Sequence, residues 1–192
     1  MTNKYVKSSE PVEIVVVADR SGSMHSIKED AIGGFNNFLK EQQKLDGEAN
    51  LTLILFNKNI DVAIDSAPIS DVLPLTEETY IPAGMTALND SIGHAVSRLQ
   101  SKNAKNAIIC ILTDGHENSS KEYTTSAIKK LIGEVSENWE VIYLAANQDA
   151  FAEASARGIT KSHNFTADSK GISDAYADMS LSASTYRSRV NG

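Results

Sequence analysis

The stretch EIVVVADRSGSM, residues 13–24, joins a run of β-branched residues to one carboxylate and two hydroxyls. A continuous apolar run without polar alternation is typical of a strand that is covered on both faces of a sheet. The run ends at Asp19, and Ser21 and Ser23 follow at alternate positions, which can point the same way in an extended loop. We therefore predict a central strand over residues 12–19 that delivers these three side chains to one edge of a sheet.

A second apolar run, NAIICILTD, also ends in an aspartate, Asp114. Between the two runs, TALNDSIGHAVSRLQSK has helical periodicity and begins with Thr86. Strand-like and helical segments alternate in this way along most of the chain, which predicts a three-layer α/β/α Rossmann-like sandwich with a mostly parallel central sheet. Ligands of such sheets bind at the carboxyl ends of the strands, so Asp19 and Asp114 are expected at the binding edge.

The stretch LTLILFNKNIDVAID, residues 51–65, breaks the parallel pattern. Its two strand-like runs are separated only by residues 57–59, which favours an antiparallel hairpin. The second run alternates apolar and polar residues, as an edge strand with one wet face does. The sheet is therefore expected to be mixed, with one antiparallel edge strand.

The remaining elements are expected as helices near 25–45, 124–138 and 149–158, and as strands near 139–146 and 161–166. Asn118 and Ser119 are expected to cap the second of these helices. Asp149 either caps the third helix or belongs to the edge of the sheet where ligands bind.

Three regions are expected along the chain: a flexible tail over residues 1–10, the α/β domain over 11–165, and a C-terminal amphipathic helix over 166–192. The helix carries an apolar stripe with alternating spacings of four and three. The stripe either packs back on the domain or forms a surface for self-association or a partner. Its members are Ile172, Tyr176, Met179, Ala183, Tyr186 and Val190.

Composition narrows the class of protein. The 192 residues carry a net charge of −7 without basic clusters, which argues against binding to nucleic acid or to an anionic membrane. The one cysteine, Cys110, lies in an apolar run and is interpreted as core filler. The first residues show no apolar signal region, and no stretch is apolar enough to span a bilayer. We therefore expect a soluble, cytoplasmic protein.

Hydroxyl and carboxylate oxygens are hard ligands, which suit Mg²⁺ or Mn²⁺ and, with so few carboxylates, suit Ca²⁺ less well. No histidine or cysteine cluster has the spacing of a zinc site. Each piece also has a simpler interpretation. Ser23 and Thr86 are common N-cap residues, and Asp114-Gly115 is a common turn. The order of the three stretches, each at the appropriate end of its element, favours an ion site.

The motifs DRSGSM, GMTAL and LTDG together resemble the metal-ion-dependent adhesion site of the von Willebrand factor type A domain, and the resemblance covers about residues 11–165. It implies a complete site in which Ser21 and Ser23 bind the ion through their hydroxyls. Thr86 would bind directly or through water. Asp19 and Asp114 would act through waters and through hydrogen bonds to the serines.

The resemblance also implies a function. Because mostly neutral ligands leave the ion positively charged, a glutamate or aspartate of a protein partner can complete its coordination. The chain is then a metal-dependent protein–protein interaction module, and not an enzyme, of a short bacterial or phage type. Two alternatives remain open: a structural or self-assembling subunit whose ion only braces the loops, and a metal-dependent phosphatase or hydrolase. Residues expected at the partner surface are Met24, His25, Gly84, Met85, His116 and Glu117. For Met24 and His25, packing at the start of the helix is an equal alternative.

Overall fold

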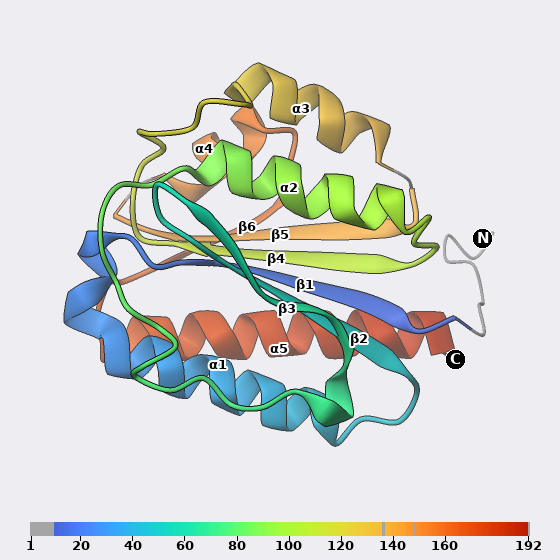
Figure 1. The fold of residues 1–192 in the computed structure, drawn as a ribbon. Helices are drawn as coiled ribbons and strands as arrows, with labels where there is room; N and C mark the ends of the chain where they lie inside the picture. Colours follow the sequence, from blue (N-terminus) through green and yellow to red (C-terminus); the bar gives the residue numbers. More distant parts are fainter. Residues whose placement is uncertain (1–9, 136, 148, 192) are drawn as a thin grey trace.

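The computed structural model describes residues 10–135, 137–147 and 149–191. Its centre is a six-stranded sheet with the strand order β3-β2-β1-β4-β5-β6. Helices α1 and α5 cover one face of this sheet, and α2, α3 and α4 cover the other (Figure 1). The strands are β1 (Val12–Asp19), β2 (Ala49–Phe56), β3 (Ile60–Pro68), β4 (Ala107–Thr113), β5 (Trp139–Ala146) and β6 (Lys161–Phe165). The helices are α1 (Lys28–Gln43), α2 (Leu88–Ser101), α3 (Thr125–Glu134), α4 (Ala150–Ala156) and α5 (Ser169–Asn191), with short 3-10 turns at Gly22–Ile27 and Ile69–Asp71.

Strand β1 lies inside the sheet, and its side chains serve two cores. Val16 and Ala18 pack in the core that α1 and α5 cover. Val15 and Val17, the alternate residues, pack on the opposite face in the core that contains α2. This is the period of two that a strand imposes on its side chains. Because neither face of this strand contacts water between residues 14 and 18, every side chain in that span is apolar, which explains why its sequence is a continuous apolar run.

The predicted mixed sheet is confirmed. Strand β1 pairs in parallel with β2 and β4, and β3 is an antiparallel edge strand joined to β2. In the register, Ala18 of β1 lies beside Leu112 of β4, so Asp19 and Thr113 end the two strands at the same edge. The parallel pairing thus places the loop after β1 next to the loop after β4.

The helix expected near residues 25–45 begins differently. A 3-10 turn over Gly22–Ile27 comes first, and α1 starts only at Lys28. Ser21 is the N-cap residue of this turn, but its side chain makes no capping hydrogen bond. Its hydroxyl instead contacts the hydroxyl of Ser23. The two serines are therefore turned toward each other and not toward the helix backbone.

The apolar stripe of α5 is buried against α1 and the sheet. Arg187 fixes this arrangement, because its guanidinium donates to the backbone carbonyls of Gln42 at 2.7 Å and Gly47 at 2.8 Å. The Gln42 carbonyl lies at the C-terminal end of α1, where helix carbonyls have no partner within the helix, and the Gly47 carbonyl lies in the connection to β2. Almost all of the tail expected over residues 1–10 lies outside the described residues. No helix in the described ranges is long and apolar enough to cross a membrane.

Candidate functional site

Three loops meet at the carboxyl edge of the sheet. One follows β1, one follows β4, and the third, residues 81–87, leads into α2 (Figure 1). Backbone hydrogen bonds join the first and the third loop: the Gly22 N–H donates to the Gly84 carbonyl at 3.0 Å, and the Ala83 N–H donates to the Arg20 carbonyl at 2.9 Å. These bonds hold the segment that contains Thr86 beside the loop that contains Ser21 and Ser23.

The five predicted ligand residues come together. The Ser23 hydroxyl donates to Asp114 Oδ1 at 2.6 Å, and the hydroxyls of Ser21 and Ser23 are 3.0 Å apart. The space beside Gly115 shows where the remaining oxygens converge. A β-carbon on this glycine would lie 3.2 Å from Thr86 Oγ1, 3.7 Å from Ser23 Oγ and 3.9 Å from Asp19 Oδ2. Oxygens of Asp19, Ser23 and Thr86 thus lie around one small volume beside Gly115, and Asp114 is joined to it through Ser23.

Asp19 is completely buried. Desolvation by burial raises the pKa of its carboxyl to about 6, although hydrogen bonds from the Thr113 hydroxyl and the Ser21 N–H, both 2.6 Å long, favour the ionised form. The nearby charge of Asp114 raises this pKa further. A buried carboxylate held in this way is costly unless a positive charge compensates it.

Asp114 is also buried, and burial raises the pKa of its carboxyl while the hydrogen bond from Ser23 opposes the rise. Arg20 lies next to Asp19 in sequence but does not compensate either acid, because its guanidinium pairs with Asp61 on β3 at 3.3 Å. The two acids therefore form a concentration of negative charge behind the serine hydroxyls.

Sequence reasoning missed two residues that hold Asp19. Thr113, the last residue of β4, binds its carboxylate, and the buried phenol of Tyr80 donates to its backbone carbonyl at 2.5 Å. Thr113 carries a weak signal, because a hydroxyl directly before Asp114 interrupts an apolar run. Tyr80 carries none, since its loop has no periodicity from which its burial could be deduced.

The loop after β4 caps the N-terminus of α2 from outside the helix. The N-cap residue of α2 is Ala87, which offers no capping side chain, so Thr86 is not the cap. Side chains of the loop bind the free backbone N–H groups instead. The Thr86 N–H donates to Asn118 Oδ1 at 2.8 Å, and the Asn89 N–H donates to Glu117 Oε2 at 2.8 Å.

The connection runs in the opposite direction as well. The Asp90 carboxylate, on the first turn of α2, accepts the backbone N–H groups of residues 121, 122 and 123. The Asn118 N–H also donates to the Thr86 carbonyl at 3.0 Å. We call these contacts between Thr86–Asp90 and residues 117–123 the α2 clamp. The clamp makes the position of Thr86 depend on the loop that carries Asp114.

The six residues expected at the partner surface differ in burial and in their contacts. Met24 is completely buried in the core between the sheet and α1, so its assignment to the surface is wrong. The Glu117 carboxylate is engaged in the α2 clamp and accepts the N–H groups of Ser119 and Ser120. The other four, His25, Gly84, Met85 and His116, are exposed at the three loops, and contact with a partner stays a prediction for them.

The capping roles expected of Asn118 and Ser119 are also wrong, because Thr124 caps α3 through the Ala127 N–H. The role of Asp149 as a cap is found, since it accepts the Ala152 N–H at the start of α4.

The donor set fits a small, hard cation. Across the described ranges, no three His, Cys, Asp or Glu side chains form a group that could hold an ion, so a site here depends on hydroxyls. Hydroxyl oxygens backed by carboxylates suit Mg²⁺ or Mn²⁺. The buried charge of Asp19 and the shared space beside Gly115 both match an added cation.

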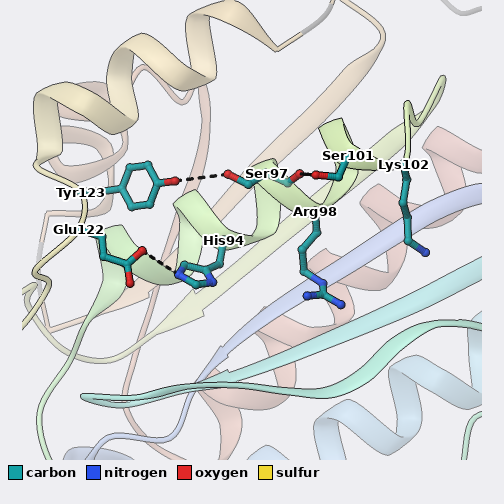
Figure 2. A pocket seen from close by; sticks show the side chains of 7 residues that line it. All are labelled: His94, Ser97, Arg98, Ser101, Lys102, Glu122 and Tyr123. Carbon is teal, nitrogen blue, oxygen red and sulfur yellow. Dashed lines mark hydrogen bonds and ion pairs between the residues drawn. The ribbon is translucent and has the colours of Figure 1, made fainter.

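A cavity of about 390 Å³ lies elsewhere, along the outer face of α2. Figure 2 shows that its charged side chains come from α2, from Lys102 directly after it, and from the segment before α3. His94 contacts Glu122 at 3.1 Å, and Arg98 pairs with Asp65 on β3. None of the five predicted ligand residues lines this cavity.

Several solved structures share the fold. The PilB minor pilin from Streptococcus sanguinis is 12% identical, with a TM-score of 0.68 over 93% of this chain and 62% of that one. Proximal thread matrix protein 1 from the mussel byssus is 16% identical, with a TM-score of 0.64 over 91% of this chain and 48% of that one. Its structure has a zinc-occupied MIDAS motif, the abbreviation for the metal-ion-dependent adhesion site. BatB from Bacteroides thetaiotaomicron is 14% identical, with a TM-score of 0.60 over 92% and 99% of the two chains.

The chain thus spans less than two thirds of the first two proteins, and at these identities the likeness concerns the fold alone. No curated protein matches the chain in sequence. The sequence model of the von Willebrand factor type A domain family matches residues 14–117. These residues run from β1 to the loop after β4 and include all five predicted ligand residues. Because this match covers more than half of the chain, the protein belongs to the von Willebrand factor type A domain family.

Proposed function

We propose that the protein is a divalent-metal-dependent protein–protein interaction module. The observation that carries this proposal is the convergence of Ser23, Thr86 and Asp19 oxygens on the space beside Gly115, with Asp114 bonded to Ser23. Ser21, Ser23 and Thr86 would hold the ion through their hydroxyls. The bound ion would supply a positively charged position to which a carboxylate of a partner protein can bind.

The two acids have a separate role in this proposal. Asp19 accepts hydrogen bonds from Ser21 and Thr113, and Asp114 accepts one from Ser23. They hold the serine loop in place and balance the charge of the ion without removing all of it. A ligand set made mostly of neutral hydroxyls keeps the ion attractive to an external anion.

Mg²⁺ and Mn²⁺ are the proposed ions. Ca²⁺ usually takes six to eight oxygen ligands, several of them carboxylates, and the site offers only two acids. Zinc prefers nitrogen and sulfur ligands. It still belongs in any titration, because the mussel protein has zinc at its MIDAS motif and because His25 and His116 flank the site here.

We propose binding rather than catalysis. Phosphotransferases that use an aspartate nucleophile need a second acid two residues later, and Ser21 stands at that place. A self-assembling subunit is the second alternative. The apolar stripe of α5 that suggested it is buried against the chain's own domain, so these side chains are covered within a single chain.

Calorimetric and thermal-melting titrations of the metal-free chain test the proposal. Mg²⁺, Mn²⁺, Ca²⁺ and Zn²⁺ are compared on the wild type, on Ser21→Ala/Ser23→Ala, and on Ser26→Ala. The last is a matched control, since Ser26 is exposed and its hydroxyl reaches only the Ser23 carbonyl, at 3.5 Å.

An ion present at about 100 times its Kd should stabilise the wild type and the control by about 2.7 kcal/mol. The double variant should lose this gain. Equal stabilisation of all three proteins, or no binding by the wild type at millimolar concentrations, would contradict the proposed ion site.

A further inference from the structure

Large apolar side chains are exposed beside the candidate site. Ile81 is 59% exposed and Met85 is 50% exposed, and both belong to the loop that presents Thr86. We call this pair the apolar rim. Other exposed large apolar residues in the described ranges lie on other elements, among them Leu45, Leu73, Phe151 and Leu181. Exposed apolar surface that is surrounded by polar residues marks interaction sites in proteins when it is contiguous.

The backbone under the apolar rim is held in place. The Asn57 side chain donates to the Ala83 carbonyl at 2.8 Å, and the Ala87 N–H donates to the Asn57 carbonyl at 2.7 Å. The bonds from Gly22 and Ala83 fix the same loop to the serine segment. Because this backbone is already ordered, a partner that covers the rim loses little conformational entropy in doing so.

The surroundings of the rim favour an acidic partner. The protein carries 25 acidic and 18 basic residues, yet residues 20–27 and 81–87 contain no acid. In the loop after β4, Asp114 is buried and the Glu117 carboxylate is engaged in the α2 clamp. The exposed acid of that loop, Glu122, lies further along the chain and pairs with His94 on α2. A carboxylate that approaches residues 20–27, 81–87 or 114–121 therefore meets no exposed acid from these segments. With an ion bound as proposed, this edge would attract an anionic group in spite of the net negative charge of the protein.

From the apolar rim and the acid-free segments 20–27 and 81–87 we infer that the partner segment carries an aspartate or glutamate directly beside an aliphatic or aromatic side chain. This inference rests on the proposed function. The carboxylate binds at the ion, and the neighbouring apolar side chain packs on Ile81 and Met85. The ion site supplies dependence on metal, whereas the rim selects among acidic segments by the residue next to the acid.

Methyl NMR of the full chain with labelled methionine can test this directly. Met85 reports on the rim, and the completely buried Met24 and Met179 serve as internal references. The probes are the peptide acetyl-Gly-Leu-Glu-Leu-Gly-amide and two analogues, one with serine in place of both leucines and one with glutamine in place of the glutamate. Each is titrated in Mg²⁺ and in chelator.

The leucine peptide should shift the Met85 methyl signal in Mg²⁺ only, and it should bind about tenfold more tightly than the serine peptide because an apolar side chain is buried. Ile81→Ser should remove most of this preference and leave the Mg²⁺ affinity unchanged. Leu181→Ser, an exposed leucine on α5, is the matched control and should change neither.

The possible failures are distinguishable. Equal affinity for the leucine and serine peptides, or an unchanged preference in Ile81→Ser, overturns the inference and leaves the proposed function standing. Binding that persists in chelator, binding of the glutamine peptide, or no binding of either glutamate peptide in Mg²⁺ contradicts the proposed function, and the inference falls with it.

Discussion

Replacing Asp19 by asparagine should make the metal-free protein more stable at neutral pH. The carboxyl is completely buried, and its pKa is raised from 3.8 to about 6. The folded state therefore holds the proton more tightly than the unfolded state. Below pH 4 most carboxyls are protonated in both states, and ionisation costs the fold little. As pH rises from about 4 through 6, the unfolded state loses its proton freely, whereas the folded state must keep the proton or ionise a buried group, and stability is lost.

The size of the effect follows from the shift. About two pKa units correspond to about 3 kcal/mol, because one unit equals about 1.4 kcal/mol. Asparagine resembles the protonated carboxyl in shape and has no charge to bury. In chelator, the free energy of unfolding of Asp19→Asn should thus exceed that of the wild type by up to about 3 kcal/mol above pH 7 and by less than about 1 kcal/mol at pH 4.

Urea unfolding in chelator at pH 4, 5.5 and 7.5 measures the difference in free energy of unfolding between the two proteins. The titration of all other groups is common to both proteins and cancels in this difference. Saturating Mg²⁺ should reverse the order at pH 7.5, since only the wild type has the carboxylate that balances the ion. A variant that is less stable than the wild type in chelator at pH 7.5 would refute the reasoning. So would a difference that does not change with pH.

Three further changes test other parts of the site. Tyr80→Phe leaves the Asp19 carbonyl without its phenol donor in a buried place and should cost about 1–3 kcal/mol in urea unfolding. Gly115→Ala puts a methyl group 3.2 Å from Thr86 Oγ1, so calorimetry should find ion binding lost while circular dichroism stays unchanged; retained affinity would mean that the ion does not use this space. Asn118→Ala removes the acceptor of the Thr86 N–H and should weaken ion binding by about tenfold, whereas Asn118→Asp, which keeps the acceptor, should restore it.

The sheet, and the shared edge at which the loops after β1 and β4 lie, could be predicted from the sequence alone. Continuous apolar runs identified β1 and β4, and parallel pairing then required Asp19 and Asp114 to share an edge. The alternation in residues 60–65 identified β3 as the antiparallel edge strand. These inferences succeed because strand periodicity and the chirality of β–α–β connections act on any sequence of this kind.

The failures concern contacts between segments that are distant in sequence. The α2 clamp joins Asn89 to Glu117 across 28 residues, and no local pattern distinguishes a carboxylate in such a clamp from one that faces a partner. Met24 was misplaced for a different reason. A 3-10 turn rotates successive side chains by a different angle from an α-helix, and the turn here directs Met24 into the core.

The attachment of α5 by Arg187 has a consequence for how the chain folds during synthesis. One face of the sheet is covered jointly by α1 and by a helix that is translated after all six strands. Until that helix leaves the ribosome, the Gln42 carbonyl at the end of α1 lacks its guanidinium donor and apolar side chains of the sheet stay open to solvent. A nascent chain at this stage would be a natural substrate for chaperones, and the final residues of the helix would close the fold.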